Sequence, residues 1–209
     1  MPPVAWGLVV PVKRLALAKT RLRSYGDVLR AELALAFATD VVTAALACPA
    51  VAELLVVTDD PRAAAVLSAL GARVEPDDPD AGLNPALSHG AELLRAGRDL
   101  GVAALSADLP ALRPADLAAA LAALRPGRRG FVADAGGTGT TLLAAPPGVE
   151  LAPAYGPGSR AAHAASGGTE LPAAPGLRLD VDTPDDLREA LRLGVGAATA
   201  AVAARLGAP

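Results

Sequence analysis

Five basic side chains stand close together near the start of the chain. Lys13, Arg14, Lys19, Arg21 and Arg23 directly follow an apolar run at 6–12 that has the pattern of a buried strand. Only two of the 19 basic residues in the chain are lysines, and both lie in this segment. Five positive charges on a loop at a strand end form an anion site, most simply for a polyphosphate. The alternative is a solvated basic loop, and the position at the end of the first strand favours phosphate.

Three aspartates have the spacing of cation ligands. Asp108 follows the apolar run 102–106, and Asp180 and Asp182 alternate in a later extended segment. Side chains two residues apart on an extended chain point the same way, so Asp180 and Asp182 should share a face. Carboxylates suit the hard cations Mg²⁺, Mn²⁺ or Ca²⁺. The alternative is that Asp108 caps a turn and that Asp182 or Thr183 caps the next helix.

Two glycine-rich segments complete the set. The stretch 136–141 holds threonine hydroxyls that can donate to an anion, although it also fits a hairpin turn. In the stretch 155–160, Ser159 precedes an alanine-rich helical segment, where its hydroxyl and free backbone N–H groups suit a phosphate or carboxylate. His163 lies four residues on and could face the same site, but a lone histidine is more often structural. We interpret His89 as structural too.

These residues need elements that position them. Apolar runs predict strands at 6–12, 53–58, 72–75, 102–106, 130–134, 140–144 and 177–180. Periodicity, caps and prolines predict helices at 27–47, 60–70, 84–100, 114–124 and 184–193, a short helix after Ser159 and a last helix ending near Leu206. Polar loops are expected at 13–26 and 76–82.

The alternation of apolar strands and helices predicts an α/β fold. Its mostly parallel sheet should be covered by helices on both faces, with an antiparallel addition in the C-terminal half. Ligands of such sheets bind beyond the carboxyl ends of the strands. The polar residues at these ends should therefore meet at one edge: 13–23, 58–60, Asp108, Asp134 and 180–182.

Composition excludes several classes of protein. The 209 residues predict one domain, 1–209, and 52% hydrophobic residues exclude intrinsic disorder. A net charge of −3 with no basic stripe argues against nucleic-acid binding. No apolar run reaches about 18 residues and no leader pattern opens the chain, which predicts a cytoplasmic protein without a membrane partner. One cysteine and two histidines exclude an internal disulfide and metal sites built on those residues.

Six motifs occur in a fixed order and carry a family resemblance. They are Val-Lys-Arg-Leu-Ala-Leu-Ala-Lys-Thr-Arg-Leu at 12–22, Leu-Asn-Pro at 83–85, Ala-Asp-Leu-Pro at 107–110, Gly-Thr-Gly-Thr at 137–140, Gly-Pro-Gly-Ser at 156–159 and Asp-Val-Asp-Thr-Pro-Asp-Asp-Leu at 180–187. Together they resemble the phosphoenolpyruvate and 2-phospho-L-lactate guanylyltransferases of coenzyme F-420 biosynthesis. The resemblance spans about residues 9–198. Its last motif is shared by many nucleotidyltransferases, whereas the lysine loop and the Gly-Pro-x-Ser segment are more specific.

The resemblance implies a fold and a reaction. The fold is GT-A-like, of the nucleotide-diphospho-sugar transferase type. The reaction joins GMP from GTP to phosphoenolpyruvate with release of pyrophosphate, giving enolpyruvyl-2-diphospho-5'-guanosine. The alanine- and arginine-rich composition favours an actinobacterial source and hence phosphoenolpyruvate, with 2-phospho-L-lactate as the alternative acid. Mg²⁺, or Mn²⁺ in its place, would be the cofactor; the oligomeric state, including a homo-oligomer, stays open.

The resemblance also implies site residues. Phosphoenolpyruvate would be bound by Thr140, Gly156 and Ser159, the metal by Asp108, Asp180 and Asp182, and the nucleotide by Lys13, Arg14, Lys19, Arg21 and Asn84, with Lys13 and Asp108 as catalytic residues. Gly158 departs from the family pattern, in which an acidic residue is common between the proline and the serine.

Three rival interpretations remain distinguishable. A molybdopterin guanylyltransferase would need a glycine-rich loop after the first strand, where this chain has Pro-Val-Lys-Arg. A GT-A glycosyltransferase usually carries its Asp-x-Asp motif in mid-chain. A non-catalytic nucleotide-binding regulatory domain would not need three strand-end aspartates, and a separation above about 10 Å would favour it.

Overall fold

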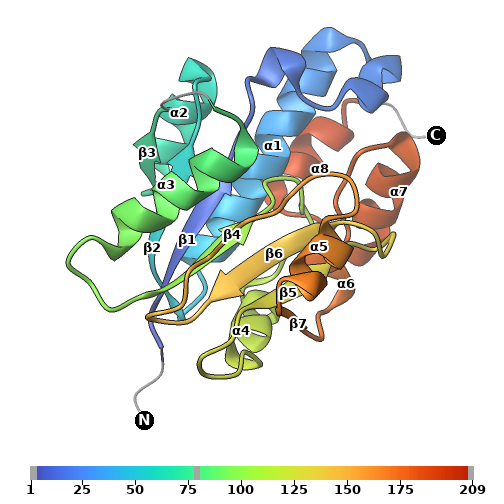
Figure 1. Cartoon of the computed structure of the whole chain (residues 1–209). Helices are drawn as coiled ribbons and strands as arrows, with labels where there is room; N and C mark the ends of the chain where they lie inside the picture. Colours follow the sequence, from blue (N-terminus) through green and yellow to red (C-terminus); the bar gives the residue numbers. More distant parts are fainter. Residues whose placement is uncertain (1–3, 78–80, 207–209) are drawn as a thin grey trace.

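A single mixed sheet of seven strands forms the centre of the protein (Figure 1). The computed structural model describes residues 4–77 and 81–206. The sheet order is β3-β2-β1-β4-β6-β5-β7. The strands are β1 (Trp6–Pro11), β2 (Val51–Val57), β3 (Arg73–Glu75), β4 (Gly101–Leu105), β5 (Gly130–Ala133), β6 (Thr140–Ala145) and β7 (Thr169–Glu170). Strands β1 to β4 pair in parallel, β6 is antiparallel to β4 and β5, and β7 is parallel to β5.

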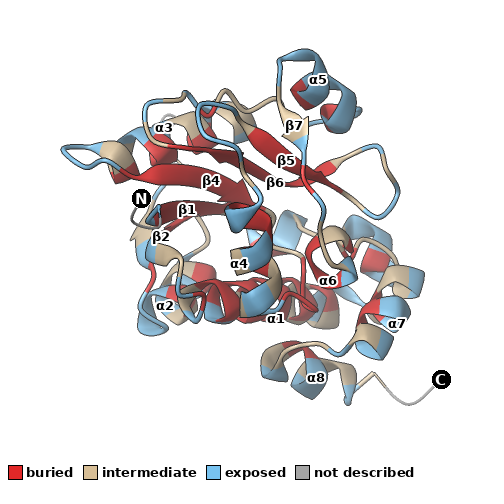
Figure 2. Ribbon diagram, turned by 90° about the horizontal axis from the view of Figure 1, so that it is seen from below, coloured by how far each residue is buried: buried red, intermediate tan, exposed pale blue. Residues whose placement is uncertain are grey.

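Helices cover both faces of this sheet, as expected (Figure 2). They are α1 (Asp27–Leu46), α2 (Pro61–Ala69), α3 (Leu83–Arg95), α4 (Pro114–Ala122), α5 (Ser159–Ala165), α6 (Pro175–Arg178), α7 (Pro184–Leu193) and α8 (Ala197–Ala203). One core packs α1, α2 and α4 against alternate side chains of the strands, and a second packs α3 against the other set. The period of two along each strand thus divides the apolar residues between the two layers. Within the described residues no helix has the length and hydropathy needed to cross a bilayer.

A third, smaller core joins the start of the chain to its end. Leu22, Leu33 and Phe37 pack there against Val181 and Leu187. Leu22 belongs to η2 (Thr20–Tyr25), a 3₁₀ helix of the basic loop, and Val181 lies between Asp180 and Asp182. This apolar contact therefore places the basic loop beside the C-terminal aspartates.

The α/β fold, its mostly parallel sheet and its antiparallel C-terminal part are confirmed. The capping box of α7 is confirmed too, with Thr183 and Asp186 bonded in both directions. The expected loop at 13–26 instead contains two 3₁₀ helices, η1 (Leu15–Leu17) and η2. Of the loop expected at 76–82, residues 78–80 lie outside the described residues.

Two predicted elements were wrong. The expected strand at 177–180 is largely the short helix α6, because Pro175 stands at its first position and fixes a helical φ. The helix expected at 84–100 ends at Arg95, and Gly97 adopts a left-handed φ of 71° soon after. Strand β7 was not anticipated, because two residues carry no periodicity.

Candidate active site

The basic loop is fastened to the body of the protein by two charged side chains. The backbone N–H of Leu15 donates to the Asp60 carboxylate at 2.8 Å, and the same carboxylate caps α2. The buried guanidinium of Arg30 on α1 donates to the carbonyls of Ala16, at 2.9 Å, and Ala18. The loop therefore has a defined shape even though most of its cationic side chains are exposed.

Lys19 is the exception among these cations. Its side chain is only 11% exposed, and its backbone has a left-handed φ of 53°. A non-glycine residue in this region is uncommon and costs conformational energy. That backbone conformation precedes η2 and directs the ammonium group toward the ends of the central strands.

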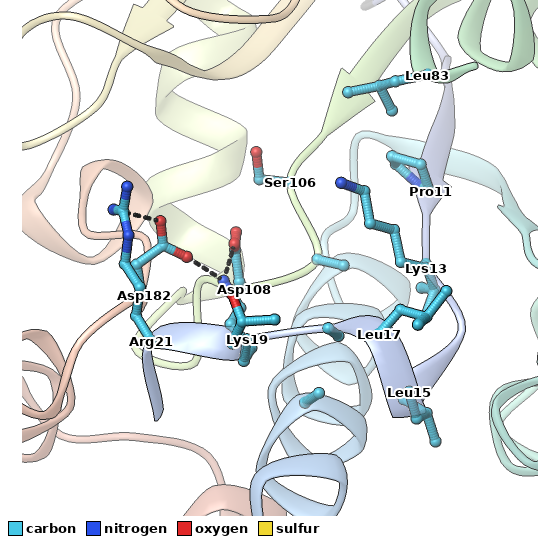
Figure 3. A pocket seen from close by; sticks show the side chains of 15 residues that line it. Pro11, Lys13, Leu15, Leu17, Lys19, Arg21, Leu83, Ser106, Asp108 and Asp182 are labelled. Atoms are coloured by element: carbon cyan, nitrogen blue, oxygen red, sulfur yellow. Dashed lines mark hydrogen bonds and ion pairs between the residues drawn. The ribbon is translucent and has the colours of Figure 1, made fainter. Parts of the chain in front are cut away.

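The Lys19 ammonium joins two of the three predicted aspartates (Figure 3). Its Nζ donates to Asp182 Oδ1 at 2.7 Å and to Asp108 Oδ2. Arg21 adds a weaker ion pair with Asp182 at 3.6 Å. The backbone also holds the aspartates together, since Val181 N–H donates to the Asp108 carbonyl at 3.0 Å. The segment after β4 and the segment before α7, which are far apart in sequence, therefore place two carboxylates around one cation.

The pKa values follow from this arrangement. Burial lowers the pKa of Lys19, but the charges of Asp108 and Asp182 outweigh it and leave that pKa above its ordinary value. Burial raises the pKa of Asp182, but Lys19 reverses the effect and leaves that pKa below its ordinary value. Asp180 has no cationic partner among residues 4–77 and 81–206, and burial together with the Asp108 charge raises its pKa to about 6.

The carboxylates have spare capacity for a cation. Oxygen Oδ1 of Asp108 is buried and has no hydrogen-bond partner among the described residues. Leu179 and Val181 are buried while Asp180 and Asp182 are half-buried, which is the alternation expected of an extended segment. In the described part of the chain, however, no group of three or more His, Cys, Asp or Glu side chains is arranged to hold a metal ion. Lys19 occupies the position between the two carboxylates instead.

A pocket of about 380 Å³ opens beside this cluster. Its walls include the basic loop, Ser106, Asp108 and Asp182, and the Lys13 side chain points into it (Figure 3). A second pocket of about 410 Å³ shares the Lys13 and Leu83 walls and extends to Asp59, which pairs with Arg14 at 3.8 Å. The expected meeting of polar strand ends is thus observed for the basic loop and for Asp59, Asp108 and Asp182.

The residues predicted for the acid lie at the start of β6, which pairs with β4, and in the segment that leads into α5. Thr140 begins β6 and Ser159 begins α5, and both are buried, at 7% and 3% exposed. Gly156 and Gly158 have φ values of 143° and 74°, which favour glycine. Gly158, where the family often has an acidic residue, therefore suits the turn that leads into α5.

Asn84 is placed differently from its predicted role. Its side-chain amide donates to the Tyr155 carbonyl at 3.0 Å and accepts from the Tyr155 N–H at 2.8 Å. The nitrogen and the oxygen of this amide therefore both tie α3 to the loop that carries Gly156. A direct contact of Asn84 with the nucleotide stays a prediction.

The glycine-rich stretch 136–141 forms the turn between β5 and β6. Asp134 accepts from the N–H groups of Thr138 and Gly139, each at 2.8 Å, and so shapes the turn. Thr141 donates to the Leu177 carbonyl at 2.7 Å and is engaged in the core. Of the three threonine hydroxyls in this stretch, only that of Thr140 lies beside His163.

Sequence reasoning missed Arg30, whose role is to hold the loop. It lies three residues before Leu33 and seven before Phe37, so it shares their helix face, and an arginine on a buried face was the available signal. His163 was considered and given a structural role. It is buried and hydrogen-bonded on both ring nitrogens.

The fold is that of nucleotide-transferring enzymes. The family model for the MobA-like NTP transferase domain matches residues 36–170. A candidate nucleotide-diphospho-sugar transferase from Desulfovibrio desulfuricans G20 has the same fold, with a TM-score of 0.70 and 18% identity over 96% of this chain and 94% of that one. A Mycobacterium tuberculosis H37Rv protein whose structure is described with manganese has a TM-score of 0.55 and 23% identity, over 90% of this chain and 98% of its own.

Comparison of sequences identifies relatives that share a more specific name within the nucleotide-transferring enzymes. A phosphoenolpyruvate guanylyltransferase of Thermomonospora curvata is 63% identical over 206 residues, which cover 97% of this chain and 90% of the relative. The enzyme of the same name from Streptomyces coelicolor is 62% identical over 205 residues, covering 96% and 97%. The chain therefore belongs to the MobA-like NTP transferases and, within them, to the phosphoenolpyruvate guanylyltransferase family.

Proposed function

We propose that the protein transfers GMP from GTP to phosphoenolpyruvate and releases pyrophosphate. The observation that carries this proposal is the convergence of Asp108 and Asp182 on one cation beside a pocket covered by the basic loop. Relatives named phosphoenolpyruvate guanylyltransferase support it. A phosphate oxygen of the acid forms a bond to the α-phosphorus of GTP. The bond from that phosphorus to the bridging oxygen breaks, and pyrophosphate leaves with the electron pair.

The basic loop would bind the triphosphate. Lys13 points into the pocket of about 380 Å³, which Arg21 also lines, and Arg14 lines the neighbouring pocket of about 410 Å³. Lys13 is a flexible point charge at the end of a long stem, so it can follow a phosphate group through the transfer. These cations would offset the repulsion between GTP and the anionic acid.

Asp108, Asp180 and Asp182 would hold a divalent cation, Mg²⁺ or Mn²⁺. When bound, this cation would neutralise phosphate oxygens and polarise the α-phosphate. The Oδ1 of Asp108, which has no hydrogen-bond partner among the described residues, supports a place for such an ion. Lys19 would have to leave its place between Asp108 and Asp182, and its ammonium would then be available to the nucleotide phosphates.

Thr140, Gly156 and Ser159 would orient the acid. They lie on three segments that the structure brings together, namely β6, the loop after Tyr155 and the start of α5. The acid needs no general base, because its phosphate is already ionised at pH 7. Catalysis then rests on alignment of the reactants and on charge neutralisation.

The test is a measurement of pyrophosphate release. The protein is incubated with GTP and Mg²⁺, and with either phosphoenolpyruvate or 2-phospho-L-lactate, with GTP alone as the control. We expect a higher kcat/KM for phosphoenolpyruvate, whose phosphate-bearing carbon is planar. If neither acid led to pyrophosphate release above the GTP-only control, the proposed function would be contradicted. A higher kcat/KM for 2-phospho-L-lactate would contradict the choice of acid.

A further inference from the structure

His163 is a buried histidine for which the proposed reaction has no use. It lies on α5 and is 1% exposed. Its ring packs against Tyr155 in an edge-on arrangement, with centroids 5.2 Å apart, and against Phe131 at 6.0 Å. Both ring nitrogens have hydrogen-bond partners, and those partners decide which nitrogen carries the proton.

The backbone fixes the tautomer of this ring. The N–H of Ala154 points at Nε2 from 2.9 Å, and a backbone N–H can only donate. Nε2 must therefore accept, so the neutral ring carries its proton on Nδ1. Nδ1 lies 2.9 Å from the Thr140 hydroxyl oxygen, which must then accept that proton's hydrogen bond.

The consequence falls on Thr140. In the described part of the chain its hydroxyl has no hydrogen-bond partner other than His163. Since the oxygen already accepts from Nδ1, the hydroxyl hydrogen is left to donate to something else. Had His163 carried its proton on Nε2, the hydroxyl would donate to the ring and would offer only an acceptor to a ligand. The backbone N–H of Ala154 thus determines, through His163, whether the Thr140 hydroxyl can donate a hydrogen bond to a ligand.

His163 also ties together the three segments of the acid site. Its own helix begins with Ser159, its Nδ1 holds β6 through Thr140, and its Nε2 holds Ala154, two residues before Gly156. Burial and the nearby charge of Arg129 lower the pKa of His163, and a proton added at Nε2 would oppose the Ala154 N–H. The ring therefore stays neutral and keeps this arrangement at neutral pH.

We propose that His163 is a positioning residue for the acid substrate: it keeps the Thr140 hydroxyl oriented as a hydrogen-bond donor toward an anionic oxygen of that substrate. This inference rests on the proposed function, because it takes Thr140 as part of the acid site. A hydroxyl held as a donor would let the uncharged side chain of Thr140 favour a carboxylate or phosphate oxygen. The hydroxyl hydrogen of Thr140 cannot turn to the ring, so an analogue without an acceptor oxygen at this point would leave that donor unsatisfied.

A matched pair of variants separates the two hydrogen bonds of the ring. In His163→Asn the amide lies near the position of Nδ1 and can still donate to Thr140, whereas it does not reach Ala154. In His163→Gln the amide lies near the position of Nε2 and can accept from Ala154, but nothing donates to Thr140. Both side chains are uncharged, and thermal unfolding reports how far each variant keeps the fold.

The binding of phosphoenolpyruvate and of GTP is measured by calorimetry with Mg²⁺ present. We expect His163→Gln to weaken phosphoenolpyruvate about five- to tenfold and His163→Asn by less than about threefold, with GTP binding unchanged in both. Exposed His89→Gln on α3 is the control. Equal losses in the two variants, or a loss of GTP affinity that matches the loss of acid affinity, would overturn the proposal.

The tautomer is tested separately on the wild-type protein. With ¹⁵N-labelled histidine the two residues His89 and His163 give separable signals, which the His89→Gln variant assigns. We expect His163 to carry its proton on Nδ1 throughout pH 6–8. A proton on Nε2 would overturn the proposal even if the enzyme is active. A correct tautomer in a protein that releases no pyrophosphate would contradict the proposed function alone.

Discussion

The basic loop and the Thr140–Ser159 corner are two different kinds of surface on one sheet edge. The loop carries charged side chains, most of them exposed, and its one buried cation is neutralised by Asp108 and Asp182. In the corner, Thr140, Ser159 and His163 are buried and uncharged side chains, and hydrogen bonds of His163 and Asn84 together with two glycines of positive φ fix its geometry. Mobile charges supply long-range attraction, whereas fixed dipoles distinguish one ligand from another. We therefore expect the loop to set the affinity for polyphosphate and the corner to select the acid.

The largest effect is expected on the charged side of this comparison. Asp108→Asn keeps the shape of the side chain but removes its charge, and loss of a metal ligand costs several kcal/mol of transition-state stabilisation. We expect pyrophosphate release to fall about a thousandfold or more while thermal unfolding stays close to the wild type. Asp185→Asn, which alters an exposed ion pair on α7, is the matched control. A rate for Asp108→Asn within about tenfold of the wild type would place the reacting centre elsewhere.

A smaller and more selective effect is expected in the corner. Ser159→Ala removes the hydroxyl that we propose donates to the acid, and a charge-assisted hydrogen bond of this kind is worth about 1.5–3 kcal/mol. Affinity for phosphoenolpyruvate should fall about ten- to a hundredfold, with little change for GTP. Titration calorimetry of each ligand against both proteins measures this. If GTP binding weakens and acid binding does not, the two regions have been assigned the wrong way round.

The smallest effect concerns stability and pH. Burial and the charge of Arg129 hold the pKa of His163 below its ordinary value. The ring of Tyr155 packs edge-on against the imidazole. The unfolded chain therefore takes up a proton at this residue before the folded protein does. Above the unfolded-state pKa of about 6.5, His163 makes its full contribution to the free energy of unfolding. This contribution declines as the pH falls from there toward the lower pKa of the folded state.

Urea unfolding at several pH values measures this decline. The wild type should lose stability between pH 7 and pH 5 more steeply than His163→Asn, which has no group to protonate there. Parallel pH profiles for the two proteins would show that His163 is not held neutral by the fold.

Much of the framework was predictable because local signals and the global fold agree. The Asp60–Pro61 cap and the Thr183 capping box mark α2 and α7, and both are present in the structure. Apolar runs located β1, β2 and β4, and the strand-end rule brought the basic loop to Asp108. The strand expected at 177–180 failed because a proline start outweighed a short alternating pattern.

The details of the site depended on contacts that are distant in sequence. Lys13 and Lys19 look alike in the sequence, yet only Lys19 reaches the aspartates. It does so because Leu22 is packed into the third core and because the backbone of Lys19 adopts a left-handed φ. The tautomer of His163 is set by the N–H of Ala154, which no pattern of residue types reveals. The sequence thus indicated that basic and acidic side chains meet at the site. Tertiary packing determines which atoms donate and which accept in its hydrogen bonds.

The central claim is that Asp108 and Asp182 form the cation site and that Lys19 holds it in the absence of substrate. The most direct measurement is manganese binding, by calorimetry without nucleotide, to the wild type and to Lys19→Met. Arg23→Met, a change to an exposed arginine of the same loop, is the control. We predict that Lys19→Met binds manganese about tenfold more tightly, because the competing ammonium is gone, and that adding Asp108→Asn abolishes the gain. Equal or weaker binding by Lys19→Met would contradict the account.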